Sequence, residues 1–138
     1  MSGKEIYCTK VRMEELDIFF ASCTEGALRV GISWAAKDIA PVQYFKRYFP
    51  QERLIENKVK NLALIEAVIS AYKKEVFVKI GLAVSFSLFQ MNVLNTIRSI
   101  RPGFVKTYKQ VAQIVNKPKA YRAVGQVLKK NPFPLLFP

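Results

Sequence analysis

The spacing of hydrophobic residues changes along the chain, and this change is the strongest constraint on the fold. From Leu16 to Trp34 a mainly apolar run, DIFFASC at residues 17–23, is followed by Thr24-Glu25-Gly26 and then by apolar residues that alternate at Leu28, Val30, Ile32 and Trp34. A period of two is typical of strands with one buried face, and glycine provides the permissive backbone that a hairpin turn needs. From Phe86 to Val127 apolar residues instead recur every three or four positions, which is the spacing of helices. The sequence therefore predicts an α+β protein whose second part is helical.

The first part is expected to contain two helices as well as the hairpin. Pro41 begins a short helical pattern that Pro50 ends. A longer helix is predicted for residues 57–74, with one apolar stripe made of Leu64, Ile65, Val68, Ile69 and Tyr72. We assign residues 1–80 to an N-terminal α+β domain, and we expect residues 74–85, which are rich in β-branched side chains, to form an extended linker.

Three helices are predicted in the second domain, residues 81–138. The first has its apolar positions at Phe86, Phe89, Val93, Ile97 and Ile100, and ends near Arg101-Pro102-Gly103. Thr107 and Gln110 have the spacing of a capping box, so a second helix is expected to begin there and to bury Tyr108, Val111, Ala112 and Val115. The third is expected at residues 118–128.

The third helix separates small from polar side chains. Ala120, Ala123, Val124 and Val127 are predicted to share the inner face, and Lys119, Arg122, Gln126 and Lys129 the outer face. Two helices joined by a short turn, the second basic on its outer face, are typical of a helix-turn-helix DNA-binding motif. Helical hairpins without a DNA partner share much of this pattern.

Charge is distributed unevenly along the chain. The net charge is +12, yet residues 1–75 contain 12 basic and 10 acidic side chains, whereas residues 76–138 contain 10 basic and no acidic ones. A solvated basic face is the simplest interpretation of such a bias. However, a stretch of 63 residues without a carboxylate has no local partner for its cations, which favours an external polyanion. Because a docking motif accompanies the charge, nucleic acid is favoured over a membrane surface.

Composition excludes several function classes. The chain contains no histidine, so Ser-His-Asp and Cys-His catalysis and histidine metal sites are excluded within it. No apolar run reaches the roughly 18 residues of a membrane span, and no signal peptide is recognisable. We therefore expect an intracellular protein without membrane attachment, whose Cys8 and Cys23 remain thiols.

A signature in the second domain resembles a known family. Thr107-Tyr108 is followed by Ala112, by a Pro-x-Ala-x-Arg-Ala-Val-Gly pattern at residues 118–125, and by Asn131-Pro132. This pattern resembles the DNA-binding part of the methylated-DNA-protein-cysteine methyltransferases, or alkylguanine-DNA alkyltransferases. The similarity extends upstream to Phe89-Gln90 and Gly103, with departures at Phe86-Ser87, Leu94 and Pro102.

The resemblance implies a fold and a function in DNA repair. It implies a small ribonuclease-H-like N-terminal unit and a winged-helix-like helix-turn-helix domain, acting as a monomer on double-stranded DNA that contains alkylated guanine. It implies no cofactor, and we predict no metal, because Cys23 lies near a zinc position of some members but four ligands are not available.

Particular residues receive roles from the same resemblance. Tyr108 would press on a backbone phosphate while the base is flipped, and Arg122 would fill the space that the base leaves. The other expected DNA-binding residues are Thr107, Lys119, Ala123, Gly125, Gln126 and Lys129. Asn131, Pro132 and Pro138 would support the active site, with Asn131 as a hinge. The simpler interpretations are a core position for Tyr108, a solvated Arg122 and an Asn-Pro helix stop at Asn131.

The acceptor of the alkyl group is expected just beyond the given sequence. In the family the proline that matches Pro138 precedes Cys-His-Arg, and neither Cys8 nor Cys23 is predicted to replace that cysteine. The 138 residues alone should therefore be inactive. We hypothesise that position 139 is a selenocysteine or a cysteine read from an in-frame UGA codon. The alternatives are a non-catalytic alkyltransferase-like damage-binding protein, a plain helix-turn-helix regulator and a nonfunctional fragment with an uncovered apolar tail at Phe133, Leu135, Leu136 and Phe137.

Overall fold

The computed structural model describes residues 4–73, 81–100 and 104–133. The chain divides into two compact units, residues 1–84 and residues 85–138. Among the described residues, no helix combines the length and the apolar character required to cross a bilayer.

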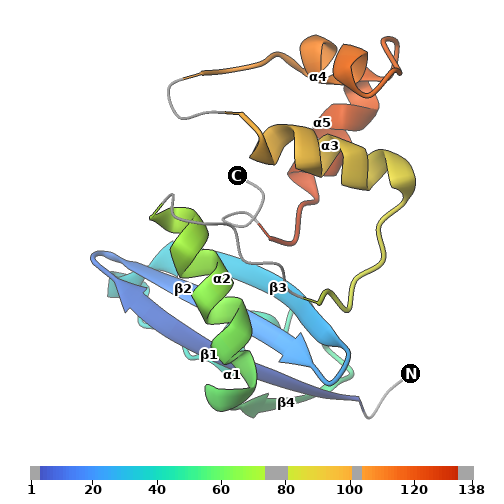
Figure 1. The fold of residues 1–138 in the computed structure, drawn as a ribbon. Coiled ribbons are helices and arrows are strands. Elements are labelled where there is room, and N and C mark those ends of the chain that lie inside the picture. The colour runs from blue at the N-terminus through green and yellow to red at the C-terminus, as the bar shows by residue number, and fades with distance from the viewer. Residues whose placement is uncertain (1–3, 74–80, 101–103, 134–138) are drawn as a thin grey trace. The chain divides into compact units, whose positions relative to one another are not determined.

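The first unit is built on a four-stranded sheet with the strand order β3-β2-β1-β4. Strands β1, β2 and β3 pair antiparallel, and β4 adds to β1 in parallel. In Figure 1, α2 lies across one face of this sheet. The elements are β1 (Glu5–Met13), β2 (Leu16–Cys23), β3 (Gly26–Trp34), η1 (Ala35–Lys37), α1 (Pro41–Phe45), β4 (Arg53–Glu56), η2 (Val59–Asn61) and α2 (Leu62–Tyr72).

The predicted hairpin is confirmed as β2 and β3. Gly26, at the turn, has a φ of 133°, a conformation that L side chains rarely adopt. The turn also packs against the chain that follows the first unit's last helix: the N–H of Ala27 donates to the carbonyl of Gly81 at 2.9 Å, and the N–H of Ala83 to the carbonyl of Ala27 at 2.8 Å. The described end of the predicted linker is therefore extended and paired with β3, whereas residues 74–80 lie outside the described residues.

Aromatic packing forms much of the core of the first unit. The rings of Phe19 and Tyr44 stack with centroids 4.1 Å apart, and Phe45 packs edge-on against Tyr44 at 5.0 Å. Ile6 and Cys8 of β1 are buried in the same cluster. Both predicted helices are present but shorter than expected, because α1 ends at Phe45 and α2 begins only after the 3-10 turn η2.

Asn61 explains where α2 begins. Its buried side chain donates to the carbonyls of Tyr7 and Asn57 at 3.1 and 2.9 Å and accepts from the Ser22 hydroxyl at 2.8 Å. These bonds join η2 to two strands, so the chain cannot continue the α2 helix toward Asn57 without breaking them.

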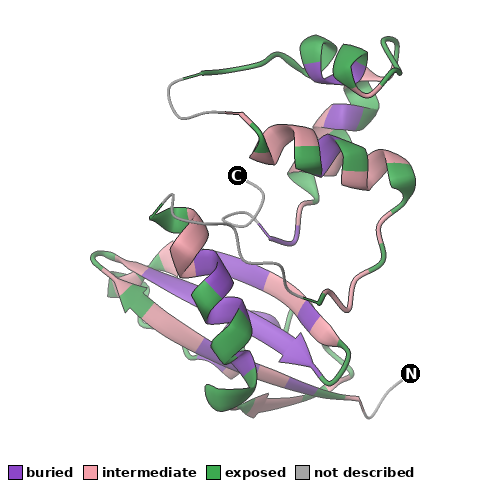
Figure 2. Ribbon diagram, viewed as in Figure 1, coloured by how far each residue is buried: buried purple, intermediate pink, exposed green. Residues whose placement is uncertain are grey.

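The second unit contains three helices, α3 (Leu88–Arg98), α4 (Tyr108–Ile114) and α5 (Tyr121–Lys129). Each helix contributes at least one fully buried residue to the core of this unit. These residues are Val93, Val111, Ala112 and Val124. Figure 2 shows short buried segments in each helix, with intermediate and exposed residues making up the rest. Leu94 is also fully buried, which the spacing pattern did not predict.

Both helices that follow extended segments begin with a capping box. At α3 the Ser87 hydroxyl accepts from the Gln90 N–H at 3.1 Å, and the Gln90 side chain accepts from the Ser87 N–H at 2.7 Å. The same pair of bonds joins Thr107 and Gln110 at α4, as predicted. Ser87, which departs from the family pattern, therefore has a clear local function as a helix cap.

Two predictions for the end of the second unit are wrong. The third helix begins at Tyr121 and not at Pro118, because the Ala120 N–H closes a turn on the carbonyl of Lys117 at 2.8 Å. Phe133 is fully buried, so it is not part of an uncovered tail. Leu135, Leu136 and Phe137 lie outside the described residues.

Candidate nucleic-acid interface

Helices α4 and α5 form a helix-turn-helix arrangement in the second unit (Figure 1). Val111 and Ala112 on α4 pack with Val124 on α5, and Val93 of α3 supports them from behind. Asn116 takes a left-handed conformation, with φ at 60°, and the N–H of Lys117 bonds to the carbonyl of Ala112 at 2.9 Å. Backbone conformation and hydrogen bonding thus fix the turn between the helices, and the turn determines the orientation of α5 relative to α4.

Tyr108 occupies the first position of α4, directly after the Thr107 cap. Its side chain is 52% exposed, so the core interpretation of Tyr108 is wrong. The ring lies against α5: a Cβ added to Gly125 would stand 3.1 Å from the Tyr108 Cε2 atom and 3.3 Å from Cδ2. Gly125 therefore allows the close approach of an exposed aromatic ring to the second helix of the motif.

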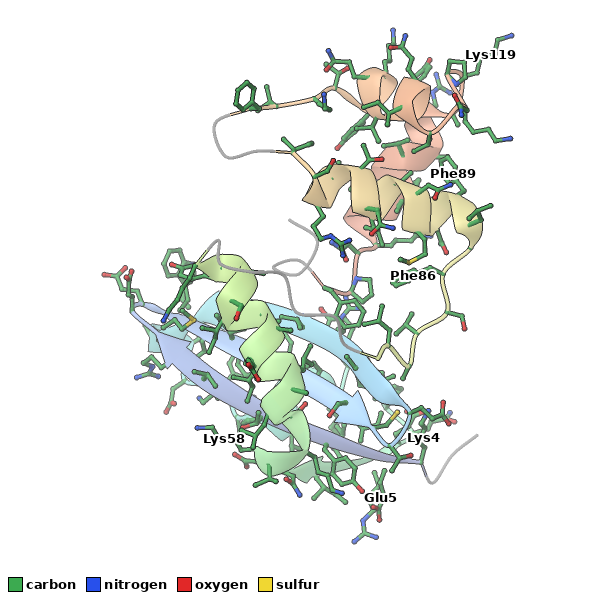
Figure 3. The ribbon with its side chains drawn as sticks, in the orientation of Figure 1. Lys4, Glu5, Lys58, Phe86, Phe89 and Lys119 are labelled. Carbon is green, nitrogen blue, oxygen red and sulfur yellow. The ribbon has the colours of Figure 1, made fainter. Side chains whose placement is uncertain are left out.

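The predicted outer face of α5 is solvent-exposed in the structure. Arg122, Gln126 and Lys129 are all exposed, and Lys119 extends from the turn that precedes the helix, as Figure 3 shows. Thr107 is exposed as well. The residues predicted to contact DNA thus share the accessible side of α4 and α5.

Ala123 lies on this exposed side, whereas the inner face was predicted for it. The inward stripe of α5 is made of Tyr121, Val124, Val127 and Leu128, and Ala123 lies at its edge, about 100° around the helix from Val124. The DNA-binding role that the family resemblance assigned to Ala123 stays a prediction.

The electrostatics of the second unit follow from its lack of carboxylates. The ion pairs of Lys4, Lys10, Arg12 and Arg53 lie in the first unit. In the second unit the Lys109 amine lies 5.3 Å from the centroid of the Tyr121 ring, so a cation–π contact joins α4 to α5. The described residues of the second unit include basic side chains and no aspartate or glutamate.

Asn131 connects the end of α5 to the segment that follows it. Its N–H donates to the carbonyl of Leu128 at 3.3 Å, and its side-chain oxygen accepts from the Phe133 N–H at 2.9 Å. Pro132, between them, is buried. Pro138 lies outside the described residues.

A cavity of about 150 Å³ adjoins this segment, and the sequence patterns did not predict it. Gln90 of the α3 capping box and Gln126 of the outer α5 face both contribute to its wall. The lining residues are Phe86, Gln90, Leu94, Gln126, Val127, Lys130, Asn131 and Pro132. Gln90, Gln126, Asn131 and Pro132 were singled out in the sequence, but no sequence pattern placed them around one cavity.

The two cysteines are buried free thiols. Burial, with a smaller contribution from the Glu56 carboxylate, raises the pKa of Cys8 to about 11. Because the thiolate is the nucleophilic form, Cys8 is a poor alkyl acceptor near neutral pH. Among the described residues, no cluster of three or more histidine, cysteine or acidic side chains could bind a metal ion.

Comparisons with known proteins agree with these features. Residues 88–138 match a family described as 6-O-methylguanine DNA methyltransferase, DNA binding domain. A methylated-DNA-protein-cysteine methyltransferase of Methanosarcina barkeri is 40% identical over 50 residues, which cover 36% of this chain and 32% of that protein. An inducible enzyme of the same name from Bacillus subtilis is 28% identical over 137 residues, covering 96% of this chain and 74% of its own length.

Solved structures show the same fold. Mycobacterium tuberculosis OGT in complex with DNA has a TM-score of 0.62, and the M. tuberculosis O6-methylguanine methyltransferase has a TM-score of 0.61. Each is 16% identical in sequence and covers 96% of this chain and 75% of the solved chain. Residues 88–138 thus match the DNA-binding domain of the 6-O-methylguanine DNA methyltransferases, and the chain is similar over nearly its whole length to a methylated-DNA-protein-cysteine methyltransferase in sequence and to M. tuberculosis OGT in fold.

Proposed function

We propose that the protein is a DNA-repair protein that binds double-stranded DNA containing alkylated guanine through α4 and α5. It flips the damaged base out of the duplex for irreversible alkyl transfer to a cysteine or selenocysteine. The observation that carries this proposal is the exposure of Tyr108, Arg122 and Ala123 on α4 and α5, in a unit whose described residues include no carboxylate.

Arg122 and Tyr108 perform the flipping step in this proposal. Extrusion of a base costs a few kcal/mol of lost stacking and pairing, which new contacts must offset. Arg122 is long, exposed and near the start of α5, so it can occupy the vacated space. The exposed ring of Tyr108, supported by Gly125, presses on the phosphate beside it.

The remaining contacts position the duplex. Lys119 and Lys129 neutralise phosphates, while Thr107 and Gln126 offer neutral hydrogen-bonding groups. The exposed methyl of Ala123 permits close approach of the DNA backbone, and the absent side chain of Gly125 leaves room for the Tyr108 ring beside it. Together these residues make a basic surface with room for the phosphates and with one group, Arg122, suited to replacing a base.

Asn131, Pro132 and Pro138 connect this surface to the acceptor. The hydrogen bonds of Asn131 to Leu128 and Phe133 support its proposed role as a hinge between α5 and the active-site segment. The acceptor is expected at the position after Pro138. There the sulfur or selenium would bond to the alkyl carbon, the bond from that carbon to guanine O6 would break, and the electron pair would stay with guanine.

We also propose the finer features that the family resemblance implies. The sheet unit corresponds to the family's ribonuclease-H-like N-terminal domain and the helical unit to its winged-helix-like domain, with the boundary near residue 80. The protein acts inside the cell as a monomer and without a metal or cofactor.

Binding to matched duplexes with and without 6-O-methylguanine tests the recognition step. We expect tighter binding to the alkylated duplex. Arg122→Ala should reduce that preference, whereas Lys119→Ala should weaken binding to both duplexes alike. Equal binding of both duplexes by the unchanged protein would indicate a plain helix-turn-helix regulator. If the two variants lose the same affinity for both duplexes, Arg122 contacts a phosphate only and does not fill the space of the flipped base.

The nucleotide sequence tests the transfer step. Translation through the codon after Pro138 should give a UGA or cysteine codon followed in frame by His-Arg-Val. The chain extended in this way should gain the mass of one methyl group when it is incubated with the methylated duplex. Recognition without any mass gain would favour a non-catalytic alkyltransferase-like protein.

A further inference from the structure

Two arginines of the first unit stack on one aromatic ring. The guanidinium carbon of Arg29, in β3, lies 3.9 Å from the centroid of the Tyr48 ring. The guanidinium carbon of Arg47, just after α1, lies 4.8 Å from the same centroid and 5.3 Å from that of Tyr44. One strand and one helix end thus bring two permanent positive charges to a single side chain.

Neither arginine has an acidic partner. Within residues 4–73, which the structure describes continuously, the cations Lys10, Arg12 and Arg53 form ion pairs with carboxylates. In contrast, no carboxylate oxygen of the described residues lies within 4.0 Å of a guanidinium nitrogen of Arg29 or Arg47. Two neighbouring guanidiniums repel each other, and the repulsion would be relieved by an anion bound between them.

The platform beneath the arginines is well supported. Tyr44 is buried, stacks on Phe19 at 4.1 Å and lies 5.9 Å from Tyr48. The Tyr48 N–H bonds to the carbonyl of Phe45 at 3.0 Å. A guanidinium stacked on an aromatic ring keeps its N–H groups at its edge, where they match the oxygens of a phosphate.

We propose that Arg29, Arg47 and Tyr48 form a phosphate-binding site on the sheet unit, and that its ligand is a backbone phosphate of nucleic acid. The inference rests on the proposed function for the identity of the nucleic acid. Phosphodiester is favoured over a carboxylate because two planar forks can share its oxygens. A polymer is favoured over the free ion because Arg47 is exposed to solvent and because, under the proposed function, duplex DNA is the anion that this protein binds.

Salt dependence of DNA binding tests this site. Each phosphate contact contributes about one to the slope of log affinity against log salt. In fluorescence anisotropy with a labelled duplex, the double variant Arg29→Gln/Arg47→Gln removes one phosphate contact, so it should lower this slope by about one while it keeps the preference for the alkylated duplex. The matched control is Arg53→Gln, which removes an exposed arginine of the same unit that pairs with Glu5 at 3.6 Å. Its slope should equal that of the unchanged protein.

An NMR titration of the unchanged protein tests the same site without a variant, so its result does not depend on whether the double variant folds. Addition of duplex should shift the Nε–Hε NMR signals of Arg29 and Arg47 and leave that of Arg53 in place. If the three signals respond alike, or the double variant has the slope of the control, the site is refuted. Shifts with inorganic phosphate but not with duplex would also refute it, because the ligand would then be the free ion. A reduced slope without any preference for alkylated DNA would retain the site and refute the proposed function alone.

Discussion

A side chain at position 125 would meet the ring of Tyr108. The Cβ of an alanine there would stand 3.1 Å from Cε2, which is tighter than ordinary van der Waals contact, and the exposed ring can relieve it only by moving away from α5. Alanine also stabilises a helix by about 1 kcal/mol relative to glycine. We therefore expect Gly125→Ala to keep or slightly raise the melting temperature and to weaken DNA binding about fivefold to tenfold, or about 1 kcal/mol.

A double-mutant cycle measures whether the ring carries this effect. In the Tyr108→Ala background the alanine at position 125 has no ring to displace, so the further loss of DNA affinity should disappear. An undiminished loss in that background would show that the methyl group introduced by Gly125→Ala obstructs the DNA directly.

Asp17 forms ion pairs with two basic side chains of the sheet unit, Arg12 and Lys10. It is 1% exposed, and its oxygens lie 3.1 Å from the Arg12 Nε and 3.4 Å from the Lys10 amine. Hydrogen bonding from Arg12, assisted by Lys10, holds the pKa of Asp17 below its usual range despite burial. A lowered pKa means that the stabilisation is present above the unfolded pKa of about 3.9 and is lost as the pH falls from there through the folded pKa.

The prediction concerns Asp17→Asn in urea unfolding from pH 7 to pH 3. At neutral pH the variant should lose roughly 2 kcal/mol of the free energy of unfolding, as expected for hydrogen bonds to a charged group. The difference from the unchanged protein should shrink as the pH falls below about 4. A difference that stays constant over the whole range would mean that packing and not charge explains the loss.

At the scale of elements, two capping boxes fix the starts of α3 and α4 in the same way, with cap bonds of 3.1 Å at Ser87 and at Thr107. Removal of such a cap costs about 1 kcal/mol, so Ser87→Ala and Thr107→Ala should lower the melting temperature similarly. Only Thr107→Ala loosens the helix turn that holds Tyr108. We expect it alone to weaken DNA binding by more than the stability loss explains. Anisotropy titrations well below the melting temperature test this, and an equal effect of both variants would argue against a special role for the start of α4.

Sequence patterns predicted those elements whose signals are local. The hairpin, the Thr107 capping box and the core positions Val111 and Val124 all followed from spacing or from turn and cap residues within a few positions. Strands β1 and β4 were not predicted, because β1 mixes polar and apolar residues without clear alternation and β4 has only four residues. Their pairing depends on partners distant in the chain, such as Tyr7 with Ser22 and with Ile55.

In the candidate interface, too, some features could be predicted from the sequence and others could not. The exposed face of α5 was predictable from helical spacing, but the positions of Tyr108 and Ala123 were not. Both residues lie where spacing alone does not decide burial. Ala123 is about 100° around α5 from the buried Val124, at the edge of the apolar stripe, and Tyr108 is in the first turn of α4 with its ring against Gly125.

The whole molecule carries its positive charge unevenly, since none of its ten acidic residues lies beyond Glu75. Repulsion among unpaired cations destabilises a compact unit, and salt screens that repulsion over about 10 Å at 0.1 M. Salt should therefore stabilise the free helical unit. The sheet unit, whose cations Lys10, Arg12 and Arg53 have acidic partners, should respond less.

Salt should thus change stability and DNA binding in opposite directions. Between roughly 50 and 200 mM salt we expect hydrogen exchange of the amides of α4 and α5 to slow, while exchange in β1 and β2 changes little. Over the same range, affinity for duplex DNA should fall by a factor of ten or more, because each neutralised phosphate releases counterions. Exchange in α4 and α5 that accelerates with salt would mean that attractive charge contacts hold the helices together. DNA affinity that is indifferent to salt would mean that the basic residues beyond Glu75 do not contact phosphate.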